Sequence, residues 1–211
     1  MKRLAIIGSG DLAKQIAHHA VVDKHYYVVG CFDDFIPKGE YSNELFILGN
    51  LDSILDCFAK NLFDELIIGV GYKHLDFRNV LFKRFEKTIP FGTIIHSSCT
   101  IDESTKVGKG TIIYPGCNMD MNVEIGNNCL IYNGCNIAHD STVSDNTIFS
   151  PGVNIAGFCS IGEHIVLGIG TVLSDHITIS NKVKTGAGTV VVKSIIESGV
   201  YVGVPAKKIK S

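Results

Sequence analysis

Residues 125–149 read IGNNCLIYNGCNIAHDSTVSDNTIF, and this stretch decides the fold. A large apolar residue returns at every sixth position, and the fourth residue after each one is small or β-branched. Asn, Gly and Asp lie between them, where turns need such residues. A helix would space apolar residues three and four apart and a flat strand two apart, so a period of six fits neither.

The same spacing continues in both directions, from Ile95 to Val191. Sixteen of its seventeen positions are apolar, and Thr185 is the exception. This period is typical of a parallel β-helix, in which each hexapeptide forms one short strand plus a corner and three hexapeptides form a triangular coil. We therefore expect five to six coils, with the large apolar residues in the centre and the small residues near the corners.

The cysteines follow the repeat. Five of the seven occupy the small inward position: Cys99, Cys117, Cys129, Cys135 and Cys159. Because free cysteine packs well as a small buried residue, we interpret them as filler rather than as a thiol site. The chain has no C-x-x-C pair and no cluster with metal-ligand spacing, so we expect no metal site.

The first ninety residues lack the period of six and alternate between two other patterns. Residues 2–10, 26–34 and 64–71 have the composition of buried strands. Residues 11–23, 51–61 and 74–87 have the pattern of helices. This alternation predicts a small α/β domain with about three parallel strands and crossover helices. The expected organisation is a βαβ domain over 1–90, a β-helix over 91–198 and a C-terminal tail over 199–211.

A glycine motif marks a candidate nucleotide site in the first domain. Gly8, Ser9 and Gly10 begin a G-x-G-x-x-A sequence between the first strand and the first helix, and Asp33 and Asp34 end the second strand. Such glycines let backbone amides approach a diphosphate, and the carboxylates accept ribose or sugar hydroxyls. An NAD-dependent oxidoreductase is one interpretation, but three strands are half of a full dinucleotide site.

Charge and hydropathy exclude other classes of function. The formal net charge is -2 and the isoelectric point is about 6.4, which gives no basic surface for nucleic acid or an anionic membrane. No run approaches the roughly 18 apolar residues of a membrane span. The apolar run near the N-terminus, residues 4–7, is too short for a signal peptide. We expect a soluble cytoplasmic protein.

Motifs along nearly the whole chain resemble those of a known protein family. They are IGSGDLAKQI (7–16), CFDDF (31–35), IIGVG (67–71) with Arg78 beyond it, IIHSSCTI (94–101), NIAHDSTV (136–143), SPGVNIAGFCSIG (150–162) and VYVGVPAKKI (200–209). In this order they resemble the sialic acid O-acetyltransferase family of hexapeptide-repeat acyltransferases. Within it, the chain is most similar to the UDP-4-amino-sugar N-acetyltransferases.

The resemblance implies a Rossmann-like N-terminal domain, a left-handed β-helix and a homotrimer with acetyl-CoA between neighbouring β-helices. It also implies that the N-terminal domain holds a nucleotide-linked sugar, and that His139 is the general base with Asp140 beside it. The expected sugar-nucleotide residues are Gly8, Ser9, Gly10, Asp33, Asp34 and Gly71. The expected acetyl-CoA residues are Gly157, Gly170, Ala187 and Pro205.

Spacing alone also singles out His139. As the third residue of its hexapeptide, it should lie at a corner and face outward. One coil later stands Gly157, which has no side chain and offers an accessible amide. Asp140 can orient the imidazole, as carboxylates do for catalytic histidines. The chain departs from its relatives at Asp140, where Glu is common, and at Ile148, where some have His.

Three functions remain open beside acetylation of a UDP-4-amino-4,6-dideoxy sugar. The first is O-acetylation of a sialic acid or another sugar by the same machinery. The second is a non-catalytic nucleotide-sugar-binding module that keeps the fold, and the third is the NAD-dependent oxidoreductase. His164 and His176 also occupy corner positions, where a histidine is usually solvated.

Overall fold

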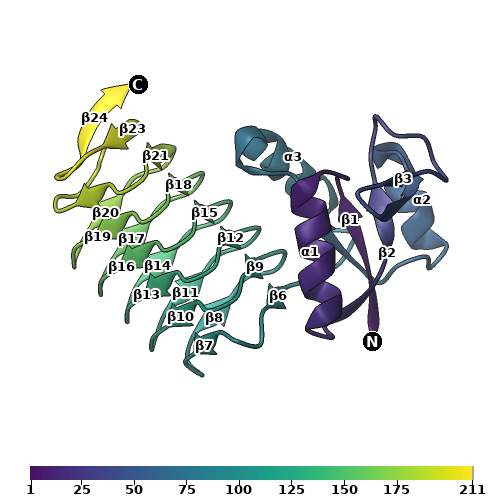
Figure 1. Ribbon diagram of the computed structural model, residues 1–211, viewed down its shortest axis with the longest axis horizontal. Coiled ribbons are helices and arrows are strands. Elements are labelled where there is room, and N and C mark those ends of the chain that lie inside the picture. The colour runs from purple at the N-terminus through teal and green to yellow at the C-terminus, as the bar shows by residue number, and fades with distance from the viewer. Residues whose placement is uncertain (211) are drawn as a thin grey trace. The chain divides into compact units, whose positions relative to one another are not determined.

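The computed structural model describes residues 1–210, which form two compact units that divide after Ile94 (Figure 1). The first unit extends past residue 90 because the chain still pairs with its sheet there. Leu66 forms a parallel bridge with Phe91, and its carbonyl accepts a hydrogen bond from the N–H of Gly92 at 3.0 Å.

The first unit contains a sheet with four parallel strands. These are β1 (Lys2–Ile7), β2 (Tyr26–Phe32), β4 (Leu45–Gly49) and β5 (Glu65–Ile68), in the spatial order β4-β2-β1-β5. The short strand β3 (Tyr41–Ser42) pairs antiparallel with β4 at the edge. The expectation of about three strands was therefore wrong. Strand β4 is a five-residue apolar run, and a run this short does not distinguish a strand from other buried segments.

Helices lie where the sequence predicts them. They are α1 (Asp11–Val22), the 3₁₀ turn η1 (Leu51–Ser53), α2 (Ile54–Ala59), the 3₁₀ turn η2 (Tyr72–His74) and α3 (Leu75–Phe85). Helix α1 approaches the sheet closely, because a Cβ added to Gly69 would lie 2.8 Å from the Cβ of Ala13. The third small position of the glycine motif, Ala13, is thus used for helix–sheet packing.

The second unit is a parallel β-helix with three sheets (Figure 1). The first sheet contains β7 (Thr100–Ile101), β10 (Asn118–Met119), β13 (Asn136–Ile137), β16 (Asn154–Ile155), β19 (Val172–Leu173) and β22 (Val190–Val191). The second contains β8 (Lys106–Val107), β11 (Glu124–Ile125), β14 (Thr142–Val143), β17 (Ser160–Ile161) and β20 (Thr178–Ile179). The third contains β6 (Ile94–Ile95), β9 (Ile112–Ile113), β12 (Leu130–Ile131), β15 (Ile148–Phe149), β18 (Val166–Leu167), β21 (Val183–Thr185), β23 (Gly199–Val202) and β24 (Lys207–Lys210).

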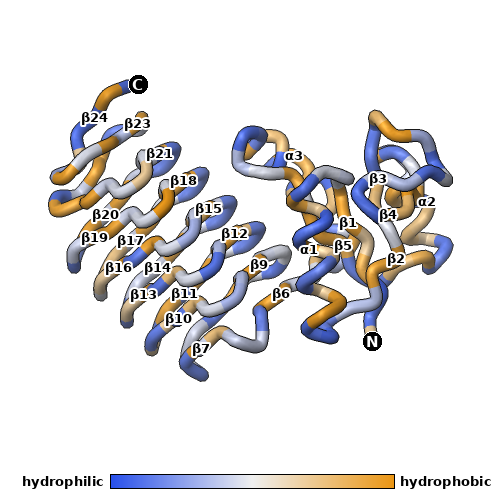
Figure 2. The backbone as a smooth tube through the Cα atoms, viewed as in Figure 1, coloured by the Kyte–Doolittle hydropathy of each residue, from blue (hydrophilic) through white to orange (hydrophobic). Residues whose placement is uncertain are grey.

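Successive coils pair eighteen residues apart, as Asn136 with Asn154 and Ile137 with Ile155. The predicted large apolar positions are buried from Ile113 to Val191, and apolar and polar segments alternate around each coil (Figure 2). At the small positions the side chain also donates a hydrogen bond. Cys117 donates to the carbonyl of Tyr132, and Ser141 to that of Ala156. Cysteine, serine and threonine therefore perform one structural task there, and the cysteines take the inward position that the repeat predicts.

The period of six ends at the last coil. Thr185, the one polar member of the series, is buried, and its Oγ1 accepts from the N–H of Gly168 at 2.9 Å. Ile195 then bridges to Ile179, sixteen residues away instead of eighteen. It thus fills the place of a large central residue, where the repeat predicted a small or β-branched residue near a corner. The expected tail forms β23 and β24, which extend the third sheet.

Corners of the β-helix repeat a left-handed backbone every eighteen residues. The first column comprises Asn122, Asp140, Phe158 and His176. The second comprises Gly110, Asn128, Asn146, His164 and Lys182, and the third comprises Gly116, Gly134, Gly152, Gly170 and Gly188. Gly, Asn and Asp suit this backbone, whereas a bulky apolar residue does not. Phe158 is the exception.

Candidate active site

His139 and Asp140 occupy the corner between β13 and β14. The imidazole Nδ1 lies 2.9 Å from Oδ2 of Asp140, and 42% of the His139 side chain is exposed. Asn122, one coil earlier, donates from Nδ2 to Oδ1 of Asp140 at 3.0 Å. The histidine therefore faces outward with one ring nitrogen engaged, as its position in the hexapeptide predicts.

Asp140 is held in its ionised form. Its hydrogen bond with His139, and after that the one from Asn122, keep the pKa of the carboxyl below its usual value. An ionised carboxylate only accepts hydrogen bonds, so it selects the tautomer with the proton on Nδ1. In the neutral ring this leaves the lone pair on Nε2, which is the atom that can remove a proton.

Gly157 lies directly against the imidazole. A Cβ added at this residue would stand 2.8 Å from Cε1 and 2.9 Å from Nε2 of His139. No side chain fits there without moving the ring. Within residues 1–210 the N–H of Gly157 donates no hydrogen bond to the protein. The corner thus combines a proton acceptor with an available donor, which is the combination that acyl transfer needs.

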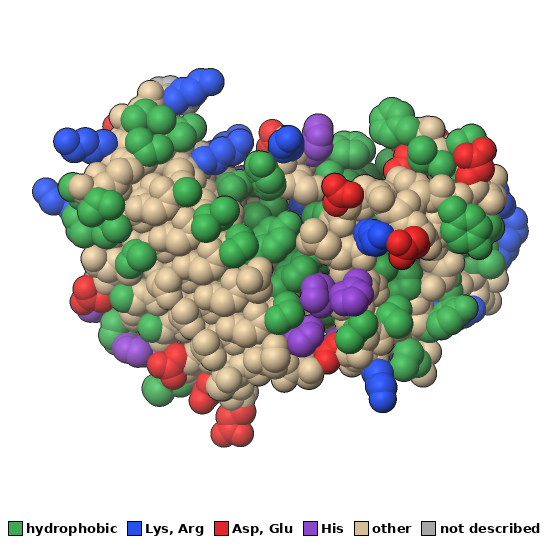
Figure 3. Space-filling model, viewed as in Figure 1, with side chains coloured by type: hydrophobic (Ala, Val, Ile, Leu, Met, Phe, Trp, Pro, Cys, Tyr) green, Lys and Arg blue, Asp and Glu red, His purple; other side chains and the backbone are tan. Residues whose placement is uncertain are grey.

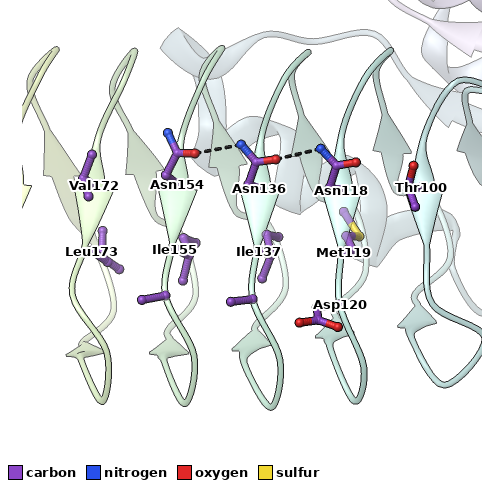
Figure 4. Close-up of a pocket in the computed structure, with 12 residues that line it drawn as sticks. Thr100, Asn118, Met119, Asp120, Asn136, Ile137, Asn154, Ile155, Val172 and Leu173 are labelled. Carbon is purple, nitrogen blue, oxygen red and sulfur yellow. Dashed lines mark hydrogen bonds between the residues drawn. The ribbon is translucent and has the colours of Figure 1, made fainter.

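A shallow groove begins beside this corner and covers the outer face of the first sheet. Its volume is about 540 Å³, and its lining includes Asp120, Ala138 and Ala156, which immediately precede the corner residues. Asn118, Asn136 and Asn154 form a ladder along it, in which each amide donates to the next at 2.7 Å (Figure 4). Asp120 is its one charged lining residue, and Figure 3 shows broad areas of the β-helix surface without charged side chains.

The other residues expected to contact acetyl-CoA lie away from His139. Gly170 belongs to the third corner column, which bounds the first sheet on its opposite side. Ala187 is exposed next to Gly188 of that column, and Pro205 is exposed between β23 and β24. The groove over the first sheet lies between the corner of His139 and the column of Gly170.

The expected sugar-nucleotide residues meet at the carboxyl ends of β1, β2 and β5. Gly8 has a φ of +98°, and its N–H donates to the carbonyl of Phe32 at 2.8 Å. The Ser9 hydroxyl donates to Oδ2 of Asp33 at 2.7 Å, while Asp34 accepts from the N–H of Leu51 at 2.9 Å. Both carboxylates therefore help to order the loops around this end of the sheet.

A cavity of about 160 Å³ opens at the same place and is mainly apolar. Gly8, Asp33 and Asp34 line it together with Ile7, Phe32, Phe35, Leu51, Val70 and Phe77. Sequence reasoning missed Phe35 and Phe77, which are exposed aromatic residues able to stack on a base. Gly71 follows Val70 but is not in the lining. Phe35 directly follows the predicted strand over 26–34, and this position could have marked it as a site residue.

Residues 1–210 lack two kinds of feature. They contain no group of three or more His, Cys, Asp or Glu side chains arranged to bind a metal ion. None of their helices has the length and apolar character needed to cross a membrane.

No protein-family model matches the chain, and neither does any curated protein sequence. Solved structures do match over the whole length. The acetyltransferase domain of PglB from Neisseria gonorrhoeae is 22% identical, covers 99% of this chain and 100% of its own, and has a TM-score of 0.89. GDP-perosamine N-acetyltransferase from Caulobacter crescentus, solved with CoA and GDP-perosamine, is 22% identical over 100% and 98%, with a TM-score of 0.89. WeeI from Acinetobacter baumannii is 21% identical over 99% and 100%, with a TM-score of 0.84. The chain thus has the fold of these proteins in both units.

Proposed function

We propose that this protein is an enzyme that transfers an acetyl group from acetyl-CoA to the amine of a nucleotide-linked amino sugar. The observation that carries the proposal is the corner at which Asp140 orients His139 while Gly157 leaves Nε2 uncovered. The shared fold adds support, because one protein with that fold was solved with CoA and a nucleotide-linked amino sugar.

In the proposed reaction the amine attacks the thioester carbonyl while Nε2 of His139 removes its proton. The N–H of Gly157 stabilises the oxyanion that develops on the carbonyl oxygen. The C–S bond then breaks, and the CoA sulfur leaves with the electron pair and takes up the proton from Nε2 of His139. Asp140 stabilises the imidazolium between these steps, since its carboxylate remains ionised.

The N-terminal unit would act as a Rossmann-like sugar-nucleotide site. Its parallel order is that of the first half of a dinucleotide-binding fold, and three of its candidate residues, Gly8, Asp33 and Asp34, line one cavity. From the resemblance we propose a UDP-4-amino-4,6-dideoxy sugar as the acceptor and a homotrimer as the assembly. The groove of the first sheet would take the extended arm of CoA.

The test incubates the protein with acetyl-CoA and with 4-amino, 3-amino and hydroxy sugars linked to UDP, dTDP or GDP, and follows products by mass spectrometry. We expect one acetyl group to be added to a 4-amino sugar. Turnover on a hydroxy sugar alone would move the assignment to O-acetylation, and absence of turnover on the whole panel would contradict the proposal.

His139→Ala is the decisive variant. Loss of a general base should lower kcat by about 10² to 10⁴-fold. His164→Asn is the matched control, because it changes a corner histidine of another column to a residue that suits the left-handed backbone. Activity that survives His139→Ala would remove this histidine from the mechanism.

A further inference from the structure

Phe158 has a backbone that phenylalanine rarely adopts. Its φ is +57°, and in residues 1–210 it is the one apolar side chain among the non-glycine residues with positive φ. Earlier coils use Asn122 and Asp140 at the equivalent corner, and their polar side chains suit this conformation. Half of the Phe158 side chain is exposed, so burial in the core does not explain its presence. An unfavourable residue that persists beside a candidate site points to a function there.

The phenyl ring of Phe158 stands against the ring of His139. Their centroids are 5.0 Å apart and their planes are nearly perpendicular, at 88°. On the next coil the ring of His176 stacks on Phe158, with centroids 4.8 Å apart and an interplanar angle of 4°. Three aromatic rings thus follow one another along this edge of the β-helix.

Each contact of the His139 ring limits a different movement. Asp140 fixes Nδ1 through a hydrogen bond, and Gly157 allows the ring to lie close to the backbone. Neither of these prevents the ring from swinging toward solvent, since 42% of the side chain is exposed. The edge contact with Phe158 supplies the missing lateral support, and perpendicular aromatic pairs at this separation are favourable.

We propose that Phe158, supported by His176, is a positioning residue that holds the imidazole of His139 with Nε2 beside Gly157. This inference rests on the proposed function, because it assigns a role relative to the general base. At this corner the left-handed backbone carries a residue that does not suit it, because the ring of that residue orients the base. Phe158 itself need not touch either substrate.

Phe158→Asn separates this role from a structural one. Asparagine suits a positive φ, so the melting temperature should stay unchanged or rise by about 2 °C. The imidazole loses its lateral support, so kcat should fall by about 10 to 100-fold while the KM for acetyl-CoA stays within twofold. Phe158→Tyr keeps the ring and should restore kcat to within threefold of the wild type, about the spread expected of a conservative change.

Lys182→Asn is the matched control for the backbone. Lys182 has a φ of +60° and lies in the second corner column. The substitution should raise the melting temperature by a similar amount and leave kcat unchanged. A fall in kcat with Lys182→Asn would show that relief of strain anywhere in the β-helix lowers activity, which would overturn the inference.

Nuclear magnetic resonance gives a readout that needs no turnover. The Cε1–H proton of His139 should show a ring-current shift that disappears in Phe158→Asn, persists in Phe158→Tyr and weakens in His176→Asn. A His139 resonance and a kcat that are unchanged in Phe158→Asn would overturn the inference and leave the proposed function intact. Wild-type protein without transferase activity would instead contradict the proposed function, while the resonance would still show whether Phe158 orders the imidazole.

Discussion

At the scale of single residues, two glycines of the β-helix serve opposite purposes. Gly134 has a φ of +69°, and a Cβ added there would meet no atom within 4 Å, so only its backbone conformation requires glycine. Gly157 has no such backbone requirement, but its missing side chain makes room for the ring of His139. One glycine is therefore needed for folding, and the other for the candidate site.

Replacing each glycine by alanine should give opposite results. Gly157→Ala should preserve the melting temperature and lower kcat by about 100-fold, because its Cβ would displace Nε2. Gly134→Ala should cost about 1 to 2 kcal/mol of folding free energy and preserve kcat of the folded enzyme. Thermal melts and steady-state kinetics of both variants test this. Full activity in a well-folded Gly157→Ala would show that the His139 ring does not need the space left by the missing side chain of Gly157.

The spacing of residues in the sequence predicts part of this corner. The period of six predicted that His139 faces outward and lies one coil from Gly157, and both are confirmed. Phe158 was not singled out, because a phenylalanine in an apolar-rich repeat is easily taken for part of the core. Alignment of residues eighteen apart would have placed it beneath Asp140 at a left-handed corner.

At the scale of elements, the asparagine ladder of Figure 4 is the side-chain counterpart of strand pairing. Asn136 has ladder bonds on both sides, whereas Asn118 has one. The net value of an exposed hydrogen bond of this type is about 0.5 kcal/mol, the low end of the usual range. The ladder should therefore stabilise the first sheet in proportion to the bonds that each member makes.

Asn136→Ala should lower the free energy of unfolding by about 1 kcal/mol, and Asn118→Ala by about half as much. Chemical denaturation of both variants, followed by circular dichroism, gives the ratio. Equal effects would mean that side-chain propensity in the strand, rather than the ladder, sets the stability. Because both residues have the same strand position, each serves as the control for the other.

Sequence patterns predicted the strands well where buried positions recur at a fixed spacing, and poorly where no such spacing exists. The strands of the regular coils are predicted by the apolar residues themselves, since each fills the same central position. The closing coil differs because Ile195 reaches the central position two residues early. Strand β4 was missed for a similar reason, since a single short run offers no repeat with which to compare it.

At the scale of the whole molecule, the two units have separate cores and different secondary structure. The helices described in residues 1–210 belong to the first unit, while the second is built from β-strands. Circular dichroism at 222 nm therefore reports mainly on the first unit. One acid-sensitive contact there joins neighbouring strands. Asp64, just before β5, accepts from the backbone N–H of Arg3 on β1 at 2.8 Å and from its guanidinium at 2.7 Å.

Asp64 should make the first unit sensitive to acid. Its hydrogen bonds with Arg3 lower the pKa of the carboxyl from 3.8 to about 2. A lowered pKa in the folded state means that the contact contributes fully above about pH 4 and is lost as the pH falls toward 2. The melting temperature at 222 nm should therefore drop across this range in the wild type. Asp64→Asn should have a lower melting temperature at pH 7, and its melting temperature should fall less in acid. The control is Asp56→Asn, which removes an exposed ion pair with Lys60. Its melting temperature should fall in acid as much as that of the wild type. An identical acid drop in Asp64→Asn would show that other carboxyls control the acid stability of this unit.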